Sequence, residues 1–203
     1  NHLTGTLPTE IAMLSQYLLS LVLDQNKFTG AIISELGKLS RLTTLSIERN
    51  SNFDKGPIPS TLGNLQNLVS LKVSSSSLTG TLPSEMGLLS NLKVLHLNEN
   101  ELTGSIPSEV LDSLTNLKLL NLSGNKLTGD LPSLEKLVVL EKLMLQRNQF
   151  EGLITLPETA PFQTLSLYYN RNLTGNIPPA LCEISSLKIL KGCEEINLEC
   201  PGD

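Results

Sequence analysis

Residues 92–102 read LKVLHLNENEL, with leucines at Leu92, Leu95, Leu97 and Leu102 and an asparagine at Asn100. Side chains alternate between the two faces of a strand, so Leu95 and Leu97 point to one face and the residue between them points to the other. Asn100 comes where the chain has to leave the strand. A unit of this length cannot bury its leucines alone, and the string therefore predicts one coil of a larger stack.

The string recurs along the chain at an almost constant interval. Its asparagines are separated by 22 to 26 residues when Ser76 is counted in the one vacant place. Such a period predicts a solenoid whose stacked strands form a parallel sheet over an aliphatic core. The asparagines, which we call the Asn ladder, are Asn26, Asn50, Asn100, Asn125, Asn148 and Asn170, and Asn1 holds the equivalent place at the start.

The ladder side chain has a specific hydrogen-bonding role. A buried amide both donates and accepts, so it can satisfy backbone groups at the turn and join neighbouring coils. Ser76 offers only one hydroxyl in that place. We therefore predict a local weak point within the run from Ser74 to Ser77.

A second signature, Leu-Thr-Gly-x-Leu/Ile-Pro, follows the ladder position in five coils, as in residues 102–107. Glycine permits backbone angles closed to other residues, and proline stops the segment from extending as a strand. With this signature, residues 1–190 resemble the plant-type subclass of leucine-rich-repeat proteins. The resemblance implies an α/β solenoid: a right-handed superhelix with a parallel sheet on its concave face, a short second sheet, and 3-10 or short helical turns, here at 36–39, 62–65 and 86–89.

The chain departs from the subclass pattern in three places. Ile33 replaces the expected proline, the segment 50–59 carries two extra residues, and 170–173 carries one. Insertions in such repeats map to loops on the rim of the solenoid. We expect them to bulge there without disturbing the core.

The two ends of the chain differ. Asn1 is already a ladder position, so we expect about eight coils over residues 1–190 that begin in mid-repeat, as in a piece of a longer protein. After Leu190 the pattern fails, and residues 191–203 are predicted to form a C-terminal cap. The three cysteines are disulfide candidates, because cysteines confined to one end suggest a stapled terminus in an oxidising compartment; free buried thiols are the alternative, and spacing does not select a pairing. They are Cys182, Cys193 and Cys200.

Composition and motifs limit the classes of function. The formal net charge of −5 and the lack of a basic run argue against a nucleic-acid or anionic-membrane partner. No apolar stretch approaches the roughly 20 residues that cross a bilayer. No nucleotide loop, zinc spacing or nucleophile motif is present. We expect neither catalysis nor a cofactor.

Two N-x-S/T sequences, at Asn121 and Asn172, would accept glycans in a secreted protein. Asn172 lies in an insertion and is the predicted acceptor. Asn121 is an outward strand position, where a glycan would obstruct the concave face, so we expect it to be unmodified.

The residues between the inward leucines form columns across the concave face, and these columns are the predicted ligand-binding surface. Near the C-terminal end they bring together Met144, Arg147, Tyr168 and Tyr169, which we call the C-terminal patch; tyrosine and arginine dominate binding hot spots. The full set of candidate contacts is Glu48, Arg49, Lys72, His96, Asn98, Met144, Gln146, Arg147, Tyr168 and Tyr169.

The favoured function is a non-enzymatic recognition module for a peptide or protein ligand, as in the receptor ectodomains and secreted defence proteins that plant-type repeats resemble. We expect it outside the cell or at the cell surface. The alternative is a secreted inhibitor of a cell-wall-degrading hydrolase. A face that binds ice or polysaccharide would need regular Thr or Asn columns, and the columns here are too varied.

Overall fold

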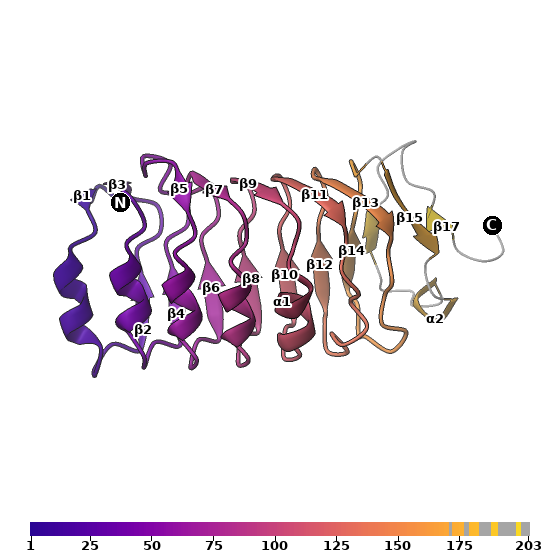
Figure 1. The fold of residues 1–203 in the computed structure, drawn as a ribbon, viewed down its shortest axis with the longest axis horizontal. Helices are drawn as coiled ribbons and strands as arrows, with labels where there is room; N and C mark the ends of the chain where they lie inside the picture. Colours follow the sequence, from indigo (N-terminus) through magenta and orange to yellow (C-terminus); the bar gives the residue numbers. More distant parts are fainter. Residues whose placement is uncertain (171, 177–178, 183–187, 191–197, 200–203) are drawn as a thin grey trace.

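The chain coils into an elongated stack in which each repeat lies beside the next (Figure 1). The computed structural model describes residues 1–170, 172–176, 179–182, 188–190 and 198–199. The prediction of a leucine-rich-repeat solenoid is confirmed, since consecutive coils contribute parallel strands to the same sheets.

One parallel sheet of eight described strands runs the length of the molecule. Its register places the core leucines opposite one another, for example Leu71 opposite Leu95 and Leu95 opposite Leu120. Every second side chain therefore points into the core. The strands, in spatial order, are β2 (Ser20–Val22), β4 (Thr44–Ser46), β6 (Ser70–Lys72), β8 (Val94–His96), β10 (Leu119–Asn121), β12 (Lys142–Met144), β14 (Thr164–Ser166) and β16 (Lys188–Leu190).

The Thr-Gly segments form the second set of strands that the resemblance implied, and they run along the top of Figure 1. A two-stranded sheet comes first, and a seven-stranded sheet follows after a break at the insertion. The first contains β1 (Thr4–Thr6) and β3 (Lys27–Thr29); the second contains β5 (Gly56–Pro57), β7 (Leu78–Gly80), β9 (Glu101–Gly104), β11 (Lys126–Asp130), β13 (Gln149–Leu153), β15 (Asn172–Asn176) and β17 (Leu198–Glu199).

Helical turns cover the convex side of the first five coils. They stack closely because glycine allows it: a Cβ on Gly63 would lie 2.3 Å from the backbone oxygen of Glu85. The described residues between α1 and α2 form no further 3-10 or α-helix, so the stack of helical turns stops at α1. The turns are η1 (Thr9–Leu14), η2 (Ser34–Lys38), η3 (Ser60–Asn64), η4 (Ser84–Leu88), α1 (Ser108–Ser113) and, near the C-terminus, α2 (Pro179–Cys182).

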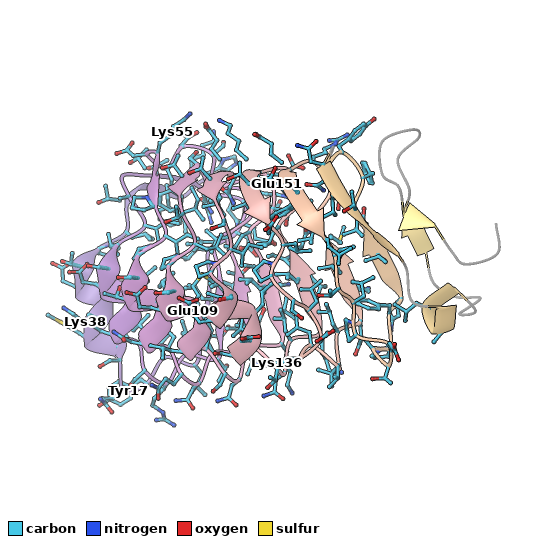
Figure 2. The ribbon with its side chains drawn as sticks, turned by 45° about the vertical axis from the view of Figure 1, so that its right-hand side comes forward. Tyr17, Lys38, Lys55, Glu109, Lys136 and Glu151 are labelled. Atoms are coloured by element: carbon cyan, nitrogen blue, oxygen red, sulfur yellow. The ribbon has the colours of Figure 1, made fainter. Side chains whose placement is uncertain are left out.

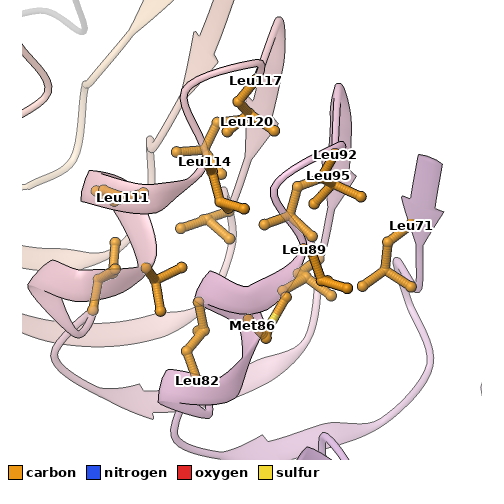
Figure 3. Packing of buried hydrophobic residues seen from close by; sticks show 14 of the residues in the cluster. Leu71, Leu82, Met86, Leu89, Leu92, Leu95, Leu111, Leu114, Leu117 and Leu120 are labelled. Atoms are coloured by element: carbon orange, nitrogen blue, oxygen red, sulfur yellow. The ribbon is translucent and has the colours of Figure 1, made fainter. Parts of the chain in front are cut away.

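Aliphatic side chains from the strands and the helical turns meet in one continuous core (Figure 3). Leu71, Leu95 and Leu120 reach it from the concave sheet, and Met86 and Leu111 reach it from the turns. Each is at most 1% exposed. The core therefore crosses every boundary between coils, and a coil is stabilised mainly by its two neighbours.

The insertion after Asn50 does more than bulge at the rim, contrary to expectation. Phe53 is 4% exposed, and its ring stacks on Phe28 with centroids 6.2 Å apart. The backbone N–H of Asp54 donates to the carbonyl of Gly30 at 2.9 Å. The loop thus adds an aromatic side chain to the core, because burying that ring offsets the ordering of the extra residues.

Candidate binding face

The predicted columns are present on the concave face, but several of their side chains are buried. Register places Lys72 opposite His96, and His96 opposite Asn121. Several outward-facing polar side chains are nevertheless buried by their neighbours, including Ser46 at 4% and Asn121 at 7% exposure. Pointing away from the core therefore does not make a side chain available to a ligand.

In the first coils the face holds an internal hydrogen-bond network. The Asp24 carboxylate accepts from the Ser46 hydroxyl at 2.8 Å and from the backbone N–H of Glu48 at 2.8 Å. The Ser74 hydroxyl lies 2.9 Å from the Glu48 carboxylate and 2.7 Å from Asn98 Oδ1. These bonds connect the polar side chains of successive coils, so part of the hydrogen-bonding capacity of this region is used within the molecule.

His96 belongs to the same network. Its Nδ1 lies 3.3 Å from Glu48 Oε1, across an intervening coil, while its Nε2 is buried with no partner among the described residues. Burial lowers the pKa of His96 below its ordinary value of 6.5; the hydrogen bond and charge of Glu48 raise it, and the charge of Lys72 lowers it further. The imidazole is therefore held toward its neutral form.

The C-terminal patch has a different character. Tyr168 and Tyr169 pack edge to face, with ring centroids 5.1 Å apart. Arg147 lies beside them, because its backbone N–H donates to the Tyr168 carbonyl at 2.9 Å. Arg147 and Tyr169 are exposed, and Met144 and Tyr168 are half-buried. The structure thus brings these residues together as an open, partly aromatic surface; Gln146, in the Tyr168 column, is also half-buried.

The residue immediately before each ladder position has a left-handed backbone. Arg49, Glu99, Arg147 and Tyr169 have φ between 54° and 59°. Among the described members of this column, the one glycine is Gly124, with φ 65°. Non-glycine residues rarely adopt such angles unless the surroundings hold them there, so the side chains of Arg147 and Tyr169 leave the chain from a fixed and strained backbone.

The Asn ladder joins coils through both ends of its amides. Asn125 Nδ2 donates to the carbonyl of Leu97 in the preceding coil at 3.0 Å, and its Oδ1 accepts the backbone N–H of Leu102 at 3.0 Å. The same two-way bonding occurs at Asn100, Asn148 and Asn170. At Asn26 the accepting bond comes from Leu3.

Two places in the ladder are incomplete. The Ser76 hydroxyl donates to the Ile47 carbonyl at 2.9 Å, which replaces the donor role of an amide, but it accepts no backbone N–H from the preceding coil among the described residues. The buried Oδ1 of Asn50 also has no partner there. The ladder therefore lacks an accepting bond at both Asn50 and Ser76, the two ladder positions on either side of the insertion.

The structure contains a second asparagine ladder, which was not predicted from the sequence. Asn67, Asn91 and Asn116 lie on the exposed rim before each strand, and each side chain donates to a carbonyl of the preceding coil at 2.8 to 2.9 Å. The sequence carried a signal, since Asn precedes the first leucine of the string in three successive coils. Val139 occupies this place in the next coil, which ends the ladder.

The remaining predicted sites are only partly described. Cys182 ends α2, while Cys193 and Cys200 lie outside the described residues. Asn172 is exposed at the start of β15. Strand β17, from the segment predicted as a cap, pairs with β15 and so adds a strand to the second sheet. Disulfides, glycan and cap remain predictions.

The described part of the chain contains no cluster of three or more His, Cys, Asp or Glu side chains placed to hold a metal ion. Within those same residues, no helix has the length and hydropathy needed to span a bilayer. The surface with distinctive chemistry is thus the concave face and the rim beside its C-terminal patch.

Known proteins share both the repeat and its three-dimensional arrangement. The family model for Leucine rich repeat matches residues 90–150. A chain in the crystal structure of the Arabidopsis receptor kinase HAESA, in complex with the peptide hormone IDA and the co-receptor SERK1, is 30% identical with a TM-score of 0.88. The match covers 98% of this chain and 33% of that one, so this chain spans about a third of its length.

Two further structures extend the comparison. A chain of the BIR3–SERK2 complex from Arabidopsis thaliana is 33% identical with a TM-score of 0.57, over 66% of this chain and 70% of that chain. A plant ice-binding protein is 27% identical with a TM-score of 0.72, over 97% and 62% respectively. The protein belongs to the plant-type leucine-rich-repeat family.

Proposed function

We propose that the chain is a recognition module that binds a peptide or protein ligand on its concave face, as the extracellular part of a receptor or as a secreted protein. The observation that carries this proposal is the contrast along that face. Around Glu48 the polar groups bond to one another, whereas around Tyr168 an aromatic pair and an arginine stand open. Exposed aromatic and arginine side chains of this kind act as anchors at protein interfaces.

The structural relatives support the same class of ligand. HAESA was crystallised with the peptide hormone IDA and the co-receptor SERK1, and the plant peptide hormone receptor RGFR1 was solved in complex with RGF2. These complexes suggest a peptide as the ligand class here. The similar ice-binding protein does not lead us to propose ice binding, because the columns of this concave face change from coil to coil.

The experiment begins with a pull-down from extracellular fluid of the source tissue, after which the recovered ligand is titrated against purified variants. Tyr168→Ala and Arg147→Ala should each weaken binding roughly tenfold, or about 1.4 kcal/mol. Tyr17→Ala is the matched control, since Tyr17 is 78% exposed at the opposite end of the solenoid (Figure 2). Equal affinity of all three variants and the parent would refute the patch.

The same material tests the inhibitor alternative. If the recovered partner is a cell-wall hydrolase, its activity should fall when the chain is added. Recovery of a short peptide, with hydrolase activity in the fluid unchanged by the chain, would remove that alternative and leave the recognition module.

A further inference from the structure

The structure distinguishes the two N-x-S/T sequences. Asn121 is 7% exposed, and its Oδ1 accepts from the backbone N–H of Ser123 at 3.1 Å and from the Ser123 hydroxyl at 2.7 Å. These two bonds fix the side-chain amide of Asn121 in a buried position, so a sugar on its Nδ2 would have to displace the neighbouring side chains of the concave face. Asn172 is exposed at the start of β15, where it pairs with Glu151 of β13. Of the two, only Asn172 can carry a bulky group without rearrangement.

A surface hollow lies directly beside Asn172. It measures about 390 Å³, which is at the small end of ligand sites and suits a single ring. Asn172 itself forms part of its wall, and the other described lining residues are Asn148, Gln149, Phe150 and Tyr169. A group attached to Asn172 would therefore start inside the hollow.

The lining chemistry suits a sugar. Tyr169 is 51% exposed, and its ring is steadied by the edge-to-face contact with Tyr168. The apolar face of an aromatic ring packs against the C–H groups of a pyranose. Gln149, which is exposed on the same wall, can donate to and accept from hydroxyl or acetamido groups. The hollow thus combines one stacking surface with amide hydrogen-bonding groups.

We propose that Asn172 carries an N-linked glycan whose first N-acetylglucosamine occupies this hollow and packs against Tyr169. This inference rests on passage through the secretory pathway, which the proposed function includes. Transfer joins Asn172 Nδ2 to C1 of the sugar of a lipid diphosphate oligosaccharide donor. The C1–O bond to the diphosphate breaks, the lipid diphosphate leaves with the electron pair, and the amide proton passes to a base of the transferase.

The glycan also limits which residues of the binding face a ligand can reach. It covers the outer side of Tyr169, so that the ligand meets Tyr168, Arg147 and Met144 from the concave side. The sugar then forms one wall of the ligand site, and Tyr169 supports it in place of touching the ligand.

The test starts with expression of the full chain in a eukaryotic secretory host and mass mapping of its glycopeptides. Asn172 should be occupied and Asn121 empty. Thr174→Val should abolish the modification, whereas Thr174→Ser, which preserves the acceptor sequence, should retain it. An unmodified Asn172, or a modified Asn121, would overturn the assignment whatever the chain binds.

A second measurement tests the hollow. An endoglycosidase that leaves only the first N-acetylglucosamine should keep the midpoint of thermal unfolding, and Asn172→Gln should lower it. The difference between these two forms should disappear in a Tyr169→Ala background and persist in a Tyr17→Ala background. A difference of equal size in both backgrounds would show that the sugar does not pack on Tyr169. Neither readout involves the ligand, so failure here is separable from failure of the proposed function.

Discussion

The Oδ1 atom of Asn100 accepts the backbone N–H of Leu78 at 3.1 Å, so that a side chain of one coil completes the hydrogen bonding of the coil before it. The same oxygen accepts from the Ser76 N–H at 3.0 Å, and Nδ2 donates to the Val73 and Leu97 carbonyls at 2.8 and 2.9 Å. One buried amide thus bonds to backbone groups of its own coil and of the preceding one.

Replacement of Asn100 by alanine should therefore be costly. It leaves buried donors and acceptors without partners, at about 1–3 kcal/mol for each group that water cannot reach. We expect a loss of about 2–4 kcal/mol in the free energy of unfolding, measured by denaturant titration. Asn116→Ala is the control, because its single 2.9 Å bond lies on the exposed rim. Equal losses from the two variants would contradict the bridging role of Asn100.

Gly63 should tolerate no side chain. An added Cβ would meet the Glu85 carbonyl at 2.3 Å, and that backbone belongs to the next helical turn, so the coils would have to separate. Gly63→Ala should cost about 1–3 kcal/mol by overpacking. At Gly56 the nearest atom is the Asp54 carbonyl at 3.9 Å, and Gly56→Ala should change the thermal midpoint little. A stable Gly63→Ala variant would mean that the turns can move apart freely.

His96 should make stability depend on pH. Its pKa is lowered in the folded chain, mainly by burial, from an ordinary value of 6.5. The unfolded chain therefore binds the proton more readily, and the free energy of unfolding falls as the pH drops below 6.5. The contribution of His96 is fully present above that pH. His96→Gln should flatten this part of a stability–pH curve, and an unchanged slope would show that another group is responsible.

Glu101 should make the free energy of unfolding depend on pH in a second, more acidic range. Hydrogen bonds from Lys126 and Lys55 lower the pKa of its carboxyl from 4.5 to about 2. Lys126 Nζ lies 2.8 Å away, and Lys55 reaches the same carboxylate from the insertion loop at the rim (Figure 2). The stabilisation is present above pH 4.5 and is lost as the pH falls toward 2. Glu101→Gln should remove that portion, and salt should weaken it in the parent because these charges are exposed.

The period of the sequence was enough to predict the solenoid and the columns, because a strand register set by repeated leucines places Lys72 beside His96 without further information. Whether each column residue is buried, and which residue it bonds to, could not be predicted from the period. Ser46 is buried because Asp24 and its neighbours close over it, which depends on side-chain conformations in other coils. The contact between Glu48 and His96 spans 48 residues and skips a coil.

Two other features, the rim ladder and the burial of Phe53, have a signal in the local sequence, but the leucine pattern does not include it. The rim ladder at Asn67 repeats with the same period as the main ladder. Phe53 is a single aromatic residue in an otherwise polar insertion, and its buried ring stacks on Phe28. The stacking of Phe53 on Phe28 could not be predicted from the sequence, because it depends on how the insertion folds back on the preceding coil.

The serine at position 76 has a consequence for how the chain comes apart. In a linear array each coil is held by its two neighbours, so the molecule separates most readily where the coupling between neighbours is smallest. Ser76 makes no accepting bond to the coil before it among the described residues, and Asn50 lacks one as well. The coils before Ser76 should therefore exchange their amide protons as one cooperative unit, earlier than the coils after it. A protease should make its first cut in the insertion segment 50–59, outside the half that carries Tyr168 and Tyr169.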